Sequence, residues 1–204
     1  MAVGMGANVT ILDRSVDQLR HIENVFGASV SKVFSTEEAV RQYVEKSDLV
    51  IGAVLVPGHS APKVVTREML RQMRPGSVLV DIAIDQGGCF ETSRPTSHQD
   101  PTYVEEGVVH YCVTNMPGAC PRTSCLALGN VTLPYTIALA EKGTVEALKS
   151  DSNLLQGLNT AFGQVTCEPV ADSLGLPYQN AEMLLHHSLK PKLHGEQPLM
   201  QQRA

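Results

Sequence analysis

Two aspartates in this 204-residue chain follow apolar runs that are typical of β-strands. Asp13 ends the run 8–13, and Asp85 follows the run 77–84 and stands just before the glycine pair 87–88. A carboxylate at a strand end can accept hydrogen bonds from ribose hydroxyls, move a proton, or orient a substrate ammonium group. Glycines beside it let a ligand approach the backbone closely. On spacing alone, either aspartate could also be an ordinary turn residue.

A third polar segment, residues 114–124, follows another apolar run and contains two prolines. Asn115 offers amide donors and an acceptor that suit the amide of a nicotinamide ring or a substrate carboxylate. Met116 could pack against a ring, although a methionine is more often a core residue. The segment is therefore a candidate binding turn between a strand and a helix.

Strands and helices are predicted to alternate through the first 121 residues, and these elements must position the three candidate segments. Strands are expected over residues 8–13, 28–34, 48–56, 77–84 and 108–113. Helices are expected over residues 16–25, 36–46 and 66–73, the first capped by Ser15 and the second by Ser35 in a capping box with Glu38. This alternation predicts an α/β fold, a doubly wound parallel sheet with right-handed crossovers. The continuous apolar run 48–56 further predicts a strand covered on both faces.

The pattern changes after Pro121, where no further convincing strand is found. Residues 123–142 predict a helix that stops at Gly143, and short helices are expected over 151–158, 169–174 and 181–189. From Lys190 the sequence is polar and contains prolines. We therefore expect three segments: residues 1–121, 122–189 and a polar tail over 190–204.

Asp13 has the position of the acidic residue that binds the adenosine ribose in dinucleotide-binding domains and repels a 2′-phosphate. Arg14 could instead bind a 2′-phosphate. The glycine-rich fingerprint of such domains lies about 20 residues before this acidic residue, which places it ahead of residue 1. Gly4 and Gly6 do not supply it, because they lead into a strand instead of opening a helix. The chain is therefore expected to begin inside a dinucleotide-binding domain.

Composition excludes several other classes of function. A net charge of −5 without a basic stripe argues against a nucleic-acid partner, and the apolar stretch 49–57 is too short to span a bilayer. No basic and apolar leader opens the chain, so a soluble cytoplasmic protein is expected. The five cysteines have neither C-x-x-C nor zinc-like spacing, so reduced thiols and no metal site are expected.

Several stretches resemble the alanine dehydrogenase family. They are residues 47–58, 75–91, 93–96 and 115–118. The resemblance covers about residues 1–185, and residues 81–91 are its most specific part. It implies two Rossmann-like domains, one for NAD and one for the substrate, with the active site between them.

The resemblance also implies two groups of NAD-binding residues. On the adenosine side these are Asp13, Ser35, Val54 and Leu55, and on the nicotinamide side they are Ile82, Asp85, Asn115 and Met116. Asp85 resembles the family's catalytic aspartate, which acts with a histidine of the substrate domain. That histidine would belong to an N-terminal part ahead of residue 1.

The implied reaction is the reversible oxidative deamination of L-alanine to pyruvate and ammonium, carried out by a homo-oligomer that is commonly a hexamer in this family. Without the glycine-rich loop and the histidine, the chain alone is expected to be inactive and to associate through an open sheet edge. Two alternatives stay open. One is the NAD-binding component of a proton-translocating transhydrogenase, which tends to carry a different acidic pattern at 84–86. The other is a non-catalytic NAD-binding module.

Overall fold

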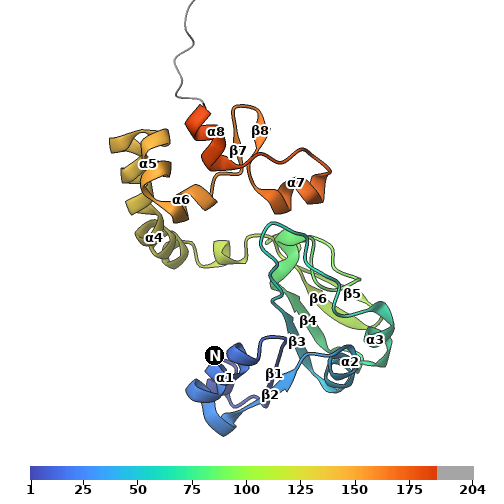
Figure 1. Ribbon diagram of the computed structural model, residues 1–204. Helices are drawn as coiled ribbons and strands as arrows, with labels where there is room; N and C mark the ends of the chain where they lie inside the picture. The colour runs from blue at the N-terminus through green and yellow to red at the C-terminus, as the bar shows by residue number, and fades with distance from the viewer. Residues whose placement is uncertain (188–204) are drawn as a thin grey trace, which may run out of the picture. The chain divides into compact units, whose positions relative to one another are not determined.

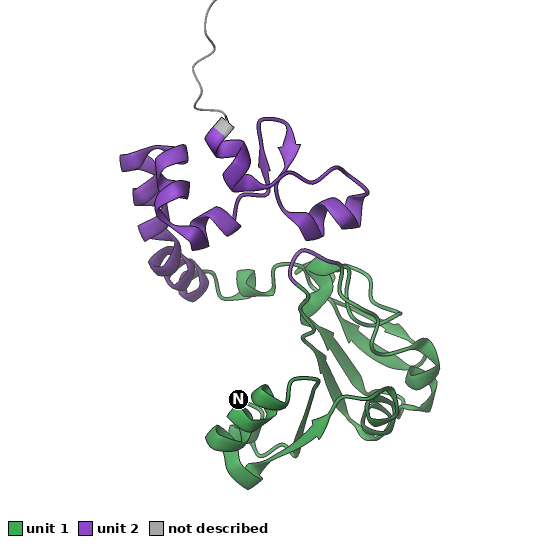
Figure 2. Cartoon of the chain, viewed as in Figure 1, with its two compact units in different colours: residues 1–56, 60–121 green, residues 57–59, 122–204 purple. Residues whose placement is uncertain are grey.

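The computed structural model describes residues 1–187, which divide into two compact units (Figures 1 and 2). Unit 1 comprises residues 1–56 and 60–121, and unit 2 comprises residues 57–59 together with the chain from Arg122 onwards. The predicted polar tail, residues 190–204, lies outside the described residues.

Unit 1 has the predicted α/β composition. Its strands are β1 (Val9–Asp13), β2 (Val30–Phe34), β3 (Leu49–Gly52), β4 (Val78–Asp81), β5 (Thr102–Glu105) and β6 (Val108–Tyr111). Helices α1 (Val16–Phe26), α2 (Glu37–Lys46) and α3 (Arg67–Gln72) connect the first four strands. The run 77–84 was predicted as one strand, but β4 ends at Asp81 and the chain continues as the 3₁₀ turn Ile82–Gln86.

The strands of unit 1 form two separate hydrogen-bonded sheets. β1 pairs in parallel with β2, and the second sheet has the order β3-β4-β6-β5, in which β5 alone is antiparallel. The sequence predicted the parallel strands but not β5. Its hairpin turn to β6 consists of Glu106 and Gly107, both with positive φ (52° and 76°). A Glu-Gly pair is a much weaker hairpin signal than Asn-Gly or Asp-Gly, so the pattern was missed.

β3 is more exposed than its apolar sequence predicted. Leu49 and Ile51 are 50% and 53% exposed, and β3 has only one hydrogen-bonded neighbour strand among the described residues. The prediction of a strand covered on both faces over 48–56 is therefore wrong for these side chains. The run 53–56 continues without regular secondary structure.

Hydrogen bonds at the helix N-termini fix where α1 and α2 begin. The Ser15 hydroxyl accepts from the N–H of Gln18 (3.3 Å), as predicted, but α2 is capped by Thr36, whose hydroxyl accepts from Ala39 N–H (3.1 Å). The predicted cap, Ser35, instead donates its main-chain N–H to the carbonyl of Asp13 (3.0 Å). Because Ser35 prolongs the pairing of β2 with β1, the cap moves one residue along the chain.

The core of unit 1 lies where α2, α3 and β4 meet the segment that follows β4. Its buried side chains are Val44, Ala61, Val65, Met69, Leu70, Met73, Leu79, Ala83, Cys89, Phe90 and Val108. Phe90 and Cys89 are the members that reach the end of β3, because they pack against the backbone of Gly52. The core therefore fixes the ends of β3 and β4 relative to each other.

Unit 2 is mainly helical and includes one short hairpin. Its elements are α4 (Pro121–Lys142), α5 (Thr144–Ser150), α6 (Ser152–Gln156), β7 (Thr160–Ala161), β8 (Gln164–Val165), α7 (Glu168–Leu174) and α8 (Ala181–His187). Asp151 caps α6 by accepting from the N–H groups of Asn153 (2.8 Å) and Leu154 (3.1 Å). Helices α6, α7 and α8 were predicted within a few residues of their described bounds, whereas helix α5 and the hairpin β7-β8 were not predicted. The last two residues of the predicted helix 181–189 lie outside the described residues.

Helix α4 is apolar and exposed. Its length and composition are sufficient to cross a membrane. The expectation from the sequence considered only the stretch 49–57 and missed this helix. A single such helix is a weak indication, since core helices of soluble proteins share these features. Leu128 and Val131 are each 62% exposed, and Pro134 lies inside the helix.

Gly52 provides a test of this packing. A Cβ at this position would lie 2.6 Å from Cζ of the buried Phe90, so Gly52→Ala requires the core to shift. We expect a loss of about 1–3 kcal/mol in the free energy of unfolding, measured by urea denaturation. The control is Gly129→Ala in α4, where no atom lies within 4 Å, and alanine should be neutral or stabilising there. Equal urea midpoints for Gly52→Ala and the unsubstituted chain would contradict the described packing.

Candidate functional site

Asp13 and Ser35 lie together at the carboxyl ends of β1 and β2. The carboxylate Oδ1 of Asp13 accepts from the N–H of Ser15 (2.7 Å), and the Asp13 carbonyl accepts from the N–H of Ser35 (3.0 Å). The other carboxylate oxygen has no partner among the described residues. The structure thus brings together two of the predicted adenosine-side residues and leaves one acceptor free for a hydroxyl donor.

Val54 and Leu55 follow β3, where Gly52 pairs with Asp81 of β4. Val54 packs against the hydrophobic core, whereas Leu55 is 64% exposed. Of these two predicted residues, Leu55 therefore offers the larger apolar surface to a ligand.

Asp85 lies in the 3₁₀ turn that follows β4. Ala83 and Ile84 are buried and anchor the turn, while Ile82 and Asp85 are exposed. The Asp85 carboxylate has no hydrogen bond or ion pair within residues 1–187. Gly87 and Gly88 follow with φ values of 88° and 73°, which favour glycine. The predicted catalytic residue is thus held by its backbone, and its carboxylate is free.

The residue immediately before this turn has a buried carboxylate, for which no role was predicted from the sequence. Asp81 is fully buried, and its Oδ2 accepts from the N–H of Cys89 (2.9 Å) and the hydroxyl of Ser93 (2.5 Å). Burial, followed by the negative charge of Asp81, raises the pKa of the Cys89 thiol to about 12. Cys89 therefore stays protonated and is not a nucleophile. An aspartate inside an apolar run was the signal for such a buried acceptor, because it needs nearby donors.

Asn115 occupies a left-handed conformation (φ 53°) after β6. Its carbonyl accepts from the N–H of Gly118 (2.9 Å), and the Nε2 of His98 lies 3.1 Å from the same oxygen. Asparagine tolerates this conformation better than most residues, which explains its place at the turn. Met116 follows it and is half-buried. The carboxyl ends of β4 and β6, which are neighbours in one sheet, thus carry all the predicted nicotinamide-side residues.

His110 is a buried structural residue of the same sheet. Its Nδ1 lies 2.9 Å from the carbonyl of Val108, which can only accept, so the ring proton is on Nδ1. Its Nε2 then accepts from the hydroxyl of Thr92 (2.8 Å), and the ring stacks on Tyr103 at 4.8 Å between centroids. Burial lowers the pKa of His110, so the ring is neutral at pH 7.

Within residues 1–187, no group of three His, Cys, Asp or Glu side chains is placed to hold a metal ion. All five cysteines are free thiols; Cys120 and Cys125 are exposed.

Comparison with known proteins identifies related sequences. The family model described as "Alanine dehydrogenase/PNT, C-terminal domain" matches residues 1–168. The alanine dehydrogenase of Halomonas elongata is 55% identical over 185 residues, which are 91% of this chain and 50% of that protein. Alanine dehydrogenase 2 of Staphylococcus aureus strain MRSA252 is 53% identical over 187 residues, with the same two shares. The chain thus spans about half the length of the curated relatives it matches.

Two solved structures are also similar. One, titled L-alanine dehydrogenase, has a TM-score of 0.76 and a sequence identity of 48%. The match covers 86% of this chain and 48% of the chain in that structure. A transhydrogenase from Sinorhizobium meliloti has a TM-score of 0.58 and 29% identity, covering 72% of this chain and 40% of its own.

The buried neutral ring of His110 predicts a pH dependence of stability. Because its folded-state pKa lies below that of a free imidazole, near 6.5, the unfolded state binds more protons as the pH falls below about 6.5. The stability that His110 contributes is therefore complete above about pH 6.5 and declines as the pH falls toward the lowered folded-state pKa.

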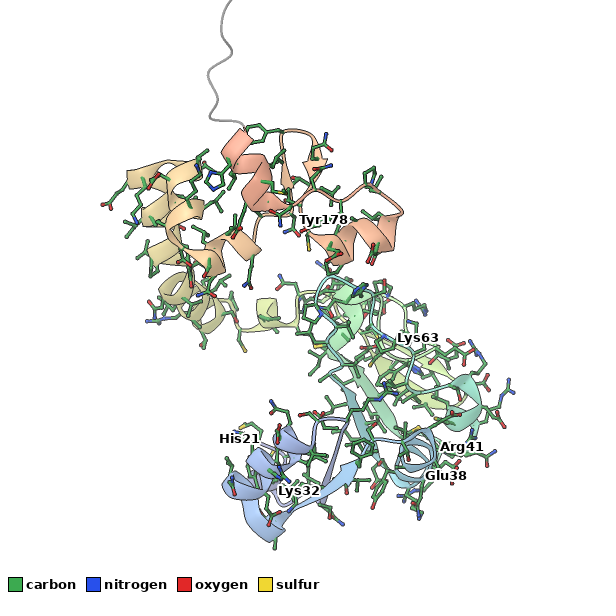
Figure 3. All side chains as sticks on the ribbon, in the orientation of Figure 1. His21, Lys32, Glu38, Arg41, Lys63 and Tyr178 are labelled. Carbon is green, nitrogen blue, oxygen red and sulfur yellow. The ribbon has the colours of Figure 1, made fainter. Side chains whose placement is uncertain are left out.

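The measurement is urea unfolding at about pH 7.5 and about pH 5.5, on either side of the ordinary imidazole pKa. The unsubstituted chain should lose more stability between these pH values than His110→Gln. His21→Gln, on α1, is the control for an exposed histidine (Figure 3) and should behave like the unsubstituted chain. Parallel losses for His110→Gln and the unsubstituted chain would rule out a buried neutral ring.

Proposed function

This chain belongs to the alanine dehydrogenase/PNT family, whose C-terminal domain it matches over residues 1–168, and from that premise we propose that it forms the NAD-binding part of an alanine dehydrogenase. The whole enzyme would catalyse the reversible oxidative deamination of L-alanine to pyruvate and ammonium. One observation carries the proposal: Asp13 ends a parallel strand, and Leu55, Asp85 and Asn115 each follow the carboxyl end of one, where α/β folds bind their ligands.

The residues of β1 and β2 fit the adenosine half of NAD. The free oxygen of Asp13 would accept hydrogen bonds from the ribose hydroxyls, since its other oxygen is held by Ser15. Its negative charge would repel a 2′-phosphate and so favour NAD over NADP. Ser35 lies beside it, and Leu55, supported by Val54, would supply apolar contact to the adenine.

The residues after β4 and β6 fit the nicotinamide half. Ile82 is 53% exposed and could pack on the ring together with Met116, while Asn115 has the donors and acceptor that a carboxamide needs. NAD, when bound there, would accept the hydride from Cα of alanine. The Asp85 carboxylate would stabilise the cationic imine of the substrate and help to move the proton of the attacking water.

The transhydrogenase alternative is less well supported, because that structure is less similar in sequence and in fold than the alanine dehydrogenase structure. A non-catalytic NAD-binding module stays an outcome of the tests below. We further propose a cytoplasmic homo-oligomer. Contacts between subunits would cover apolar surface such as α4 and the exposed side of β3.

Tests of the whole reaction need the part of the relatives that this chain does not span. We therefore define a chimaera in which that part of the Halomonas elongata alanine dehydrogenase is joined to this chain. Turnover of L-alanine with NAD by the chimaera is the expected result. NAD binding without turnover would favour the binding module.

Asp13 should determine the choice between NAD and NADP. In the chimaera, Asp13→Ala removes the charge that repels a 2′-phosphate and should narrow the NAD/NADP ratio of kcat/KM by about 10-fold or more. The matched control is Asp17→Ala, which removes an aspartate that is 90% exposed on α1. An unchanged ratio in Asp13→Ala would count against the ribose-binding role.

Asp85 should be catalytic. Asp85→Asn keeps the shape of the side chain but removes the charge, so kcat of the chimaera should fall by about 100-fold or more, on the order of 3 kcal/mol. The melting temperature should stay the same, because the carboxylate has no partner within the described residues. Asp100→Asn, also exposed in unit 1, is the control. Turnover within a few-fold of the unsubstituted chimaera would make Asp85 a turn residue only.

A further inference from the structure

The segment that follows β3 runs along the loop that carries Asp85 and is hydrogen-bonded to it. The N–H of Ala61 donates to the carbonyl of Gln86 (2.8 Å), and the N–H of Val64 donates to the carbonyl of Cys89 (2.8 Å). Both bonds connect residues about 25 positions apart in the chain, so they form only when unit 1 is folded. Two carbonyls of the loop, those of residues 87 and 88, lie between these bonds.

No main-chain N–H among the described residues donates to the carbonyls of Gly87 and Gly88. Instead, the Nζ of Lys63, the side chain labelled in Figure 3, donates to both, at 2.6 Å and 2.7 Å. The left-handed conformations of the two glycines turn consecutive carbonyls toward one point, where one ammonium group serves both. Lys63 thus supplies the donor for two carbonyls that receive no main-chain hydrogen bond from the described residues.

Lys63 makes these bonds with no carboxylate partner in the part of the chain that the structure describes. This distinguishes it from Lys32, which forms an ion pair with Glu23. Hydrogen bonds from a charged donor are about twice as strong as those between neutral groups. The two carbonyls are therefore the main electrostatic partners of the Lys63 ammonium group.

Gly87 and Gly88 follow the turn that contains Asp85. Besides Lys63, buried groups of unit 1 also hold them in place. A Cβ on Gly88 would lie 2.8 Å from the carboxylate of Asp81, so the loop fits closely against that group. The N–H groups of Gly87 and Gly88 donate to the carbonyls of Ile84 and Ala83, both at 3.0 Å. The position of the glycines therefore sets the position of the 3₁₀ turn.

We propose that Lys63 is a positioning residue for Asp85: its ammonium group fixes the Gly87 and Gly88 carbonyls and so holds the turn that presents the catalytic carboxylate. The catalytic part of this inference rests on the proposed function of Asp85. The structural part, that Lys63 holds the loop, does not depend on it.

The structural part is tested by hydrogen exchange with mass spectrometry on this chain. In Lys63→Met, amides in residues 83–91 should exchange about 10-fold faster or more, because two bonds of the loop are lost. Lys46→Met, which removes an exposed lysine at the end of α2, is the control for lost charge. Exchange in β6 should stay unchanged in both variants, which separates loop release from unfolding. Unchanged exchange in residues 83–91 would overturn the proposal.

The catalytic part is tested by turnover of the chimaera. Lys63→Ala should lower kcat by about 10-fold or more and change KM for NAD by less than about 2-fold, because the bound cofactor does not contact Lys63 in this proposal. Propylammonium should restore part of the lost kcat, whereas tetramethylammonium, which has no N–H donor, should not. Lys63→Arg should retain more activity than Lys63→Ala.

The outcomes separate the two proposals. Faster exchange with an unchanged kcat would mean that Lys63 holds the loop without positioning Asp85, and the inference would be wrong. The absence of rescue by propylammonium would count against the role of the ammonium group. An unsubstituted chimaera without turnover would instead overturn the proposed function, and the exchange result would then decide whether Lys63 holds the loop.

Discussion

The buried carboxylate of Asp81 is the constraint on which the rest of the site depends. A carboxylate taken out of water is stable only when donors surround it, since the energetic cost of an unpartnered one is several kcal/mol. Here the donors are the N–H of Cys89 and the hydroxyl of Ser93. The chain must therefore turn back after β4 to bring these donors to the end of the strand. This change of direction takes place in the 3₁₀ turn, where Asp85 is exposed, and in the two glycines that follow it.

The same return builds the core. Once Cys89 is bound to Asp81, it and Phe90 lie against the backbone of Gly52, which has no Cβ to obstruct them. A few residues later, Thr92 donates its hydroxyl to the buried ring of His110 on β6. The loop after β4 thus connects to the neighbouring strand on each side. The position of the turn that carries Asp85 and the stability of unit 1 depend on one continuous set of buried contacts.

The proposed NAD site uses this rigid support for side chains that are themselves exposed. Leu55, Ile82 and Asp85 contribute little to the core, whereas Val54, Ala83 and Ile84 beside them are packed. Alternation of anchored and exposed residues at strand ends lets a fold present ligand-binding groups without loss of stability. Lys63 is a further example: its exposed ammonium group donates to the Gly87 and Gly88 carbonyls, and the other side of their loop is buried.

The sequence did not predict that β4 ends at Asp81 and that Asp85 lies in the 3₁₀ turn after it. By itself it determined the parallel strands, the helices between them, the Ser15 cap and the placement of Asp13 at a strand end. These features depend on residue periodicity and on neighbours within a few positions, which a single sequence displays directly. Only the tertiary structure decided the antiparallel β5, the shift of the α2 cap to Thr36 and the exposure of β3. It also decided that Asp81 and Lys63 hold the loop of Asp85. Each of these depends on which segment becomes a neighbour after folding, and contacts between residues 24 positions apart, such as Lys63 and Gly87, leave no local pattern.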